Sequence, residues 1–106
     1  MGNIVIMEPE CRAIANELMP AVRVILANQM KKKYRMTQQE IANKLGIAQV
    51  AVSKYINGNY SKAVARAAKR ISKQMPEELV ARIARSSDME QVNRIIEKFC
   101  ESQVNA

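Results

Sequence analysis

The 106-residue chain contains no histidine and no tryptophan, and its aromatic residues amount to one Phe and three Tyr. Without histidine, the chain lacks the usual nitrogen ligand of zinc and the side chain that most often serves as a general base. It also has no Gly-rich phosphate loop and no pair of carboxylates that a common pocket would hold. We therefore expect no catalytic residue, no bound metal and no cofactor, and we do not expect an enzyme.

Cysteine is scarce as well. Cys11 and Cys100 stand far apart with no C-x-x-C spacing, so no sulfur quartet is available for zinc. We favour two reduced thiols that pack as small hydrophobic side chains. A disulfide between them remains the alternative, because some intracellular proteins of thermophiles contain disulfides.

Long apolar runs are absent too. No stretch approaches the roughly 18 residues of a membrane-spanning helix, and there is no apolar core of a signal peptide. We expect no membrane partner and a cytoplasmic protein associated with the nucleoid. Gly and Pro number three each, and no long run alternates apolar with polar residues. We therefore predict an all-α fold with a core of aliphatic residues and methionine.

Acidic residues are nearly missing between residues 31 and 73. This segment carries eleven bases against Glu40 alone, a balance of +10, whereas the whole chain carries +7. The bases are Lys31, Lys32, Lys33, Arg35, Lys44, Lys54, Lys62, Arg66, Lys69, Arg70 and Lys73. Such a run indicates either a solvated helix face or a polyanionic partner.

Residues 37–58, TQQEIANKLGIAQVAVSKYING, show the pattern of two short helices packed against each other. Thr37 and Glu40 form a capping box that predicts the start of the first helix, and Gly46 predicts its end. The inward apolar positions are Ile41, Ala42, Leu45, Ile47, Val52, Tyr55 and Ile56. This arrangement is typical of a helix-turn-helix, whose second helix enters the DNA major groove.

The second helix, expected over about residues 49–56, leaves Gln49, Val50, Ser53 and Lys54 on its outer side. Glutamine can pair with the N6 and N7 atoms of adenine, valine can contact a thymine methyl group, and lysine can reach guanine or a phosphate. Asn57, one turn beyond Ser53, is a candidate contact to the DNA backbone. The absence of Arg and Asn within this helix favours modest sequence selectivity.

Further DNA-binding candidates lie at the start of the first helix of the motif and on both sides of residues 37–58. They are Gln38, Lys31, Lys32, Lys33, Lys62, Arg66, Lys69 and Arg70. We expect the bases among them to contact phosphates, which fix the register of a protein on DNA without reading its sequence. Ala48, by contrast, lacks the side-chain oxygen that normally caps a helix such as the second one.

The N-terminal part should be helical from Pro9, because proline is favoured in the first turn of a helix. Pro20 predicts a break or kink, after which a second helix should reach about Tyr34. The apolar run at residues 4–7 is interpreted as an arm or a lone strand.

The C-terminal part predicts a basic amphipathic helix over residues 62–74 and another helix opened by Pro76. Ser87 with Glu90 forms a second capping box before the last helix. The apolar stripe of that last helix comprises Met89, Val92, Ile95, Ile96 and Phe99. It either covers the core or forms a dimer seam. We divide the chain into a DNA-binding domain at residues 1–74 and a helical extension at 75–106, a possible dimerisation element.

The segment LMPAVRVILANQMKKKYRMTQQEIANKLGIAQVAVSKYING resembles the helix-turn-helix of Cro/repressor-like regulators, and more closely that of small archaeal transcriptional regulators. It is also similar to small basic archaeal chromatin-type proteins. The resemblance covers roughly residues 18–60. It implies that Ala42 and Gly46 serve the close packing and the left-handed turn of the motif, and that Gln49, Val50, Ser53 and Lys54 face the groove.

Three functions compete at this stage. The first is a homodimeric transcription regulator that binds double-stranded DNA with two recognition helices about 34 Å apart. The second is an architectural, chromatin-like protein with little sequence specificity. The third is a protein-interaction module that uses the last helix and exposed methionines. No small-molecule effector is evident from the sequence.

Overall fold

The computed structural model describes residues 9–104, with side chains described for residues 17–103. Over that range the chain forms six α-helices and no strand. They are α1 (Pro9–Lys32), α2 (Gln38–Leu45), α3 (Gln49–Ile56), α4 (Lys62–Ser72), α5 (Glu77–Arg85) and α6 (Met89–Val104). The predicted all-α fold is confirmed, and the apolar run at residues 4–7 lies outside the described residues. None of these helices has the length and apolar character needed to cross a membrane.

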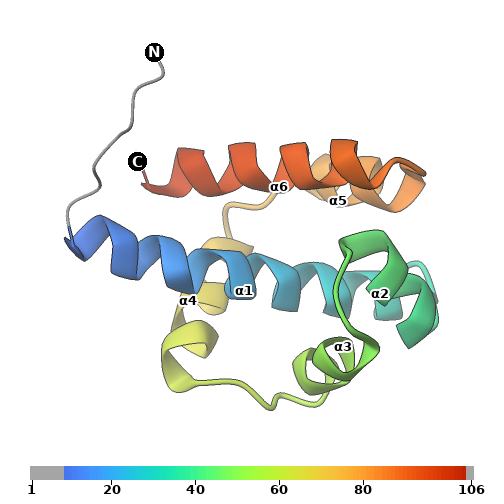
Figure 1. Cartoon of the computed structure of the whole chain (residues 1–106), viewed down its shortest axis with the longest axis horizontal. Helices are drawn as coiled ribbons and strands as arrows, with labels where there is room; N and C mark the ends of the chain where they lie inside the picture. The colour runs from blue at the N-terminus through green and yellow to red at the C-terminus, as the bar shows by residue number, and fades with distance from the viewer. Residues whose placement is uncertain (1–8, 105–106) are drawn as a thin grey trace.

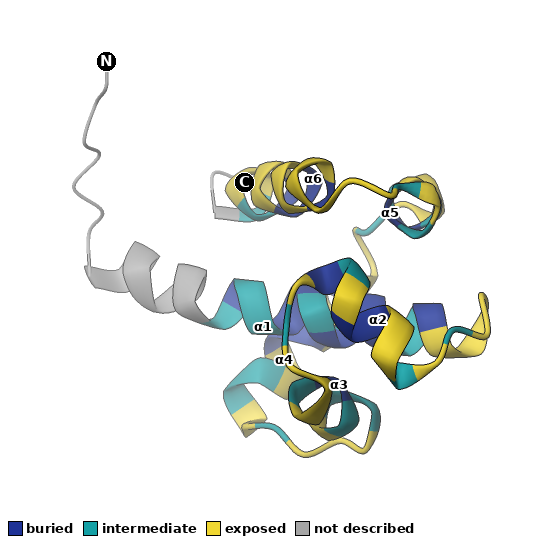
Figure 2. Ribbon diagram, turned by 45° about the vertical axis from the view of Figure 1, so that its right-hand side comes forward, coloured by how far each residue is buried: buried dark blue, intermediate teal, exposed yellow. Residues whose placement is uncertain are grey.

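Helix α1 is the centre of the arrangement, since all five other helices contact it. Figure 1 shows α5 and α6 on one side of α1 and α3 on the other, and α4 packs along α1. The turned view of Figure 2 keeps α3 and the α5–α6 pair on opposite sides of α1. The candidate recognition helix and the C-terminal helices therefore present different faces of the molecule.

Of the break or kink predicted at Pro20, the break is wrong, because α1 runs as one helix from Pro9 to Lys32 with Pro20 inside it, and the kink stays a prediction. A proline within a helix costs about 3 kcal/mol. Burial of one large aliphatic side chain contributes about 1.5–3 kcal/mol. Leu18 and Val22, on either side of the proline, are both fully buried in the core. Their packing outweighs the lost hydrogen bond. The helix also ends two residues before the predicted end at Tyr34.

The caps of α2 form as predicted. The Glu40 N–H donates to the Thr37 hydroxyl at 3.1 Å, and the Thr37 N–H donates to the Glu40 carboxylate at 2.8 Å. These bonds to Thr37 lower the pKa of Glu40. Gly46 adopts a φ of 67°, and its N–H donates to the carbonyl of Ala42. A Cβ on Gly46 would also lie 2.9 Å from Sδ of Met89, which would have to shift, so both the backbone angle and this contact favour glycine.

One hydrophobic core includes residues of all the helices. Val92 and Ile96 of α6 are fully or almost fully buried in it, and Ile95 and Phe99 are 8% exposed. The apolar stripe of α6 thus covers the core within one chain, which was one of the two interpretations of the sequence. Met89 is the member that stays outside, with 48% of its surface exposed. Figure 2 shows this buried interior between the helices.

The predicted capping box of Ser87 and Glu90 is wrong. The Glu90 N–H donates instead to the Asp88 carboxylate at 3.0 Å, and the Val92 N–H donates to the Asp88 carbonyl at 3.1 Å. A carboxylate caps a helix as well as a hydroxyl does, and Asp88 lies directly before the first residue of α6. Pro76 is the cap residue directly before α5, in agreement with the prediction that it opens this helix.

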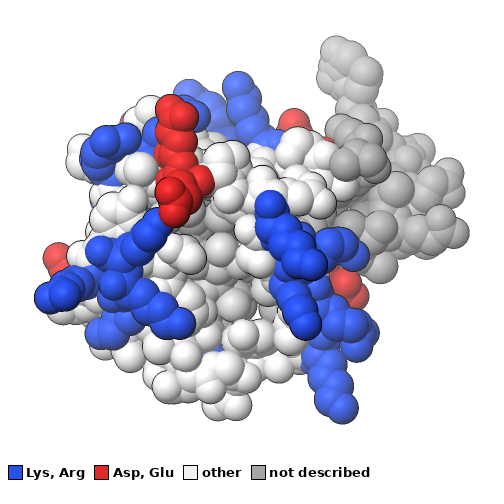
Figure 3. Space-filling view, turned by 180° about the vertical axis from the view of Figure 1, so that it is seen from behind, with Lys and Arg blue, Asp and Glu red and all other residues white. Residues whose placement is uncertain are grey.

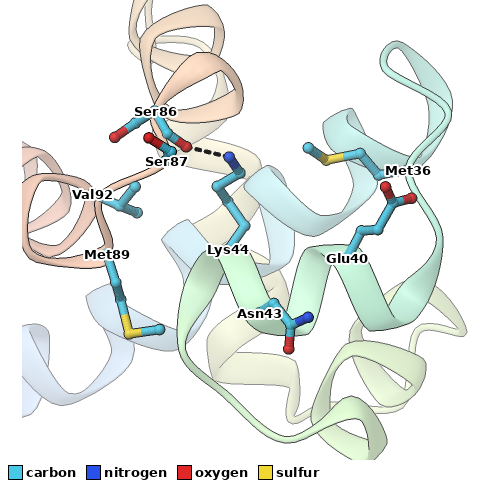
Figure 4. A pocket seen from close by; sticks show the side chains of 8 residues that line it. All are labelled: Met36, Glu40, Asn43, Lys44, Ser86, Ser87, Met89 and Val92. Carbon is cyan, nitrogen blue, oxygen red and sulfur yellow. Dashed lines mark hydrogen bonds between the residues drawn. The ribbon is translucent and has the colours of Figure 1, made fainter.

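The junction between α5 and α6 lies against α2. Figure 4 shows the Lys44 side chain pointing to Ser86, whose carbonyl accepts a hydrogen bond from Nζ of Lys44. Met89 reaches over Gly46 from the start of α6. These contacts join the C-terminal helices to the end of α2, where the turn of the motif begins.

Cys100 is a free thiol and half-buried, and its Sγ lies 3.4 Å from Sδ of Met19. Burial raises the pKa of this thiol above its ordinary value. The interpretation as a packed, reduced thiol is confirmed for Cys100. The side chain of Cys11 lies outside the described side chains.

Candidate nucleic-acid interface

Helix α3 is held from behind by the core and by one hydrogen bond from α1. Val52 is fully buried, and Tyr55 and Ile56 are half-buried against the core. Nδ2 of Asn28 donates to the carbonyl of Tyr55 at 3.3 Å and to the carbonyl of Val24, in its own helix, at 2.8 Å. Asn28 thereby ties the C-terminal end of α3 to the central helix. This contact could not be predicted from the sequence, because the residues are 27 positions apart and share no pattern.

The opposite side of α3 is exposed. Gln49, Val50 and Lys54 are exposed and Ser53 is half-buried, which agrees with their predicted outward placement. Val50 is 67% exposed, the highest value among the large exposed hydrophobic side chains of the described residues. An aliphatic side chain at that exposure contributes little to the core. It is available to contact an apolar group such as a thymine methyl.

The two ends of α3 differ in how they are capped. Ala48, the cap residue before α3, has extended backbone angles (φ −70°, ψ 146°) and makes no side-chain cap, as predicted. At the other end, Nδ2 of Asn57 donates to the Ser53 hydroxyl at 3.3 Å. Gly58 follows with a φ of 77°, in the left-handed region that favours glycine. Ser53 and Asn57 thus bind each other in the free protein, and Asn57 remains exposed.

Two groups of basic residues lie on the face seen in Figure 3, separated by uncharged surface. At the C-terminal end of α4, a shallow hollow of about 340 Å³ is lined by Arg66, Lys69 and Arg70 of the helix and by Lys73 and Gln74 just after it. All four bases of this α4 basic group are exposed. The structure thus brings together three of the predicted phosphate contacts, along with Lys73.

The remaining candidates lie at the ends of helices. Lys62 is the first residue of α4 and exposed, and Gln38 is the first residue of α2 and half-buried. Lys31 and Lys32 are exposed in the last turn of α1. Each of these positions borders a loop of the motif region.

Lys33 differs from its neighbours because it forms an ion pair inside the molecule. Its Nζ lies 2.5 Å from Oε1 of Glu77, at the start of α5. The hydrogen bond to Glu77 raises the pKa of Lys33, and the same bond lowers the pKa of Glu77. This pairing joins the end of α1 to α5 and partly neutralises the charge of Lys33. The sequence did not indicate it, since 44 residues separate the partners.

Comparison with known proteins adds a family to this geometry. A family model described as helix-turn-helix matches residues 26–81, which is more than half of the chain. The matched region extends from Leu26 in α1 to Ala81 in α5, so it includes α2, α3 and the α4 basic group. Neither the comparison with curated proteins nor that with solved structures found a match.

Proposed function

Because the chain belongs to the helix-turn-helix family, we propose that it binds double-stranded DNA with α3 in the major groove and so regulates transcription. The observation that carries this proposal is the outer face of α3. Gln49, Val50 and Lys54 are exposed on a short helix whose other side is fixed by Val52 and by the bond from Asn28. A helix held in this way can enter a groove without a change in the fold.

Each outward side chain has its own role in the proposed complex. Gln49 pairs with the N6 and N7 atoms of an adenine, and Val50 contacts a thymine methyl group. Lys54 reaches a guanine edge or a phosphate. Asn57 contacts the DNA backbone, for which it exchanges its bond to Ser53 for one to a phosphate oxygen. The base-reading part of the interface is therefore small.

The basic residues supply most of the affinity. Six predicted phosphate contacts have no ion pair within the described residues: Lys31, Lys32, Lys62, Arg66, Lys69 and Arg70. A protein that neutralises six phosphates on duplex DNA shows a slope of about −5 for log K against log salt concentration. Lys33 contributes less than these six, because Glu77 already binds it.

We further propose that two chains occupy one site, with their α3 helices in successive major grooves about 34 Å apart. The apolar stripe of α6 is buried within its own chain, so the contact between two chains uses another surface. Mass measurement of the DNA complex tests this stoichiometry. One chain per selected duplex would contradict it.

An architectural protein with little sequence specificity is the second candidate. The observation that favours it is the contrast between a small base-reading face and the dense bases on α4 and at the end of α1. Such a protein would bind all duplexes with similar affinity and with the same steep dependence on salt.

Selection of bound duplexes from a random pool, followed by salt titration of the winners, separates the two candidates. A regulator yields a shared sequence whose affinity exceeds that of random DNA at every salt concentration. Winners without a common sequence, bound no better than the starting pool, would favour the architectural protein. A chain that retards no duplex even at low salt would overturn DNA binding itself.

A further inference from the structure

Helices α5 and α6 lie on the side of α1 that faces away from α3 (Figure 1), and side chains of both helices line a groove. Its volume is about 380 Å³, near the lower end of the range of roughly 300–1,000 Å³ for ligand sites. The lining residues are Leu79, Arg82, Gln91, Arg94, Ile95, Lys98 and Phe99. We call this the α5–α6 groove. Nothing in the proposed DNA complex uses it.

The groove combines an apolar floor with a basic rim. Ile95 and Phe99 belong to the core and expose only 8% of their surface, so they close the groove from below. Arg82, Arg94 and Lys98 are exposed around it, and none of the lining residues is acidic. This is the surface that an apolar side chain with carboxylates beside it would match.

The three bases are also available for a partner. Within the described residues, neither Arg82 nor Lys98 forms an ion pair. Arg94 lies 3.8 Å from Glu90 of its own helix, with 69% of its side chain exposed. An exposed pair of this kind contributes only about 0.3–0.5 kcal/mol, so a better-placed carboxylate can displace it.

We infer that the α5–α6 groove binds a short acidic segment of a partner protein. One apolar side chain of that segment enters the groove over Phe99, and Asp or Glu residues beside it pair with Arg82, Arg94 and Lys98. Because the groove and α3 lie on opposite sides of α1, the chain can hold this partner and a duplex at the same time. The protein would then bring an acidic partner to its DNA site.

The charges of the chain argue against two other occupants of the groove, a second copy of the chain and a second DNA duplex. A symmetric pair of chains would place the three bases of each groove against the three bases of the other, which is repulsive. A second duplex would meet a segment, residues 75–106, that carries six acidic residues against four bases. This segment as a whole repels a polyanion, although the groove itself is basic. A short acidic segment can stay within the groove, whose lining includes no acidic residue, whereas a duplex would extend over the acidic residues around it.

The test uses the full-length chain and a fluorescent synthetic peptide of about 15 residues, in which one leucine is flanked by glutamates. Binding is measured by anisotropy, without DNA and then with a bound duplex. The groove variant is Arg82→Glu, which reverses one charge of the groove. The matched control is Arg85→Glu, since Arg85 is exposed on α5 but does not line the groove. Circular dichroism confirms that both variants are folded.

We expect the groove variant to weaken peptide binding at least tenfold, and Arg85→Glu to change it by less than twofold. Bound duplex should leave the peptide affinity unchanged. Equal losses from both variants would overturn the proposal, because they would indicate non-specific charge attraction. Loss of binding on Lys69→Glu rather than on the groove variant would also overturn it.

Two further outcomes would assign the groove to another occupant and thereby refute the proposal. One is a loss of duplex affinity in the groove variant, and the other is a change in its self-association by sedimentation. The readout without DNA does not depend on the proposed function of α3. The experiment therefore distinguishes a groove that binds no acidic peptide from an α3 helix that binds no DNA.

Discussion

Replacement of Gly46 by alanine tests how the turn between α2 and α3 is built. The residue has a φ of 67°, a backbone conformation that is about 1–2 kcal/mol less favourable for a residue with a Cβ. The lower chain entropy of alanine in the unfolded state offsets about 0.4–1 kcal/mol of this cost. The new Cβ would also lie 2.9 Å from Sδ of Met89, a contact that costs about 1 kcal/mol because a methionine side chain can shift. We therefore expect Gly46→Ala to lower the free energy of unfolding by about 2 kcal/mol.

Gly58 provides a matched control. It has a φ of 77°, but a Cβ there would meet nothing within 4 Å. Gly58→Ala should therefore cost only the backbone part, about 1 kcal/mol. Urea unfolding followed by circular dichroism measures both values. In a Met89→Ala background, the cost of Gly46→Ala should fall to that of Gly58→Ala. Equal costs in the wild-type background would refute the role given to Met89, and two neutral changes would refute the left-handed turn itself.

Three other changes have definite expected outcomes. Ala48→Ser supplies the missing cap of α3 and should raise the free energy of unfolding by about 1 kcal/mol, as measured by urea unfolding. Arg35 has a φ of 52°, so Arg35→Gly should relieve strain and stabilise the chain by up to about 1 kcal/mol, as measured by urea unfolding. A less stable variant would contradict this reasoning. The pKa of Glu77 is lowered by Lys33. Its contribution to stability is therefore present above the unfolded-state pKa of about 4.3 and is lost as the pH falls through the lower folded-state value. Melting temperatures between pH 5 and pH 2 should consequently change less in Glu77→Gln than in the wild type, and identical profiles would exclude this ion pair in solution.

The sequence predicted the motif well because its helix ends are determined locally. The Thr37–Glu40 capping box and the glycine at position 46 act through neighbouring backbone groups, and α3 begins and ends at the predicted residues. The outward placement of Gln49 and Val50 followed from the helical period alone. Features within one or two turns of each other are therefore readable from the sequence.

The sequence predicted less well where a feature depends on residues far apart in the chain, or where two neighbouring residues can both cap the same helix. Pro20 was expected to interrupt α1, but residues packed from other helices hold α1 together. Asp88 displaced Ser87 as the cap of α6, since both can accept the same kind of hydrogen bond. The bonds of Asn28 to α3 and of Lys33 to α5 join residues 27 and 44 positions apart, where no periodic pattern operates. Only the folded chain shows them.

The central claim is that α3 reads the bases of DNA while the basic groups bind its phosphates. One pair of variants tests this claim directly. The affinities of wild type, Gln49→Ala and Lys69→Ala are measured on a selected duplex and on a scrambled duplex at several salt concentrations. Gln49→Ala should cost about 1–3 kcal/mol on the selected duplex and almost nothing on the scrambled one. Lys69→Ala should weaken both duplexes alike and reduce the salt slope by about 1. Equal losses on both duplexes from both variants would contradict base reading by α3.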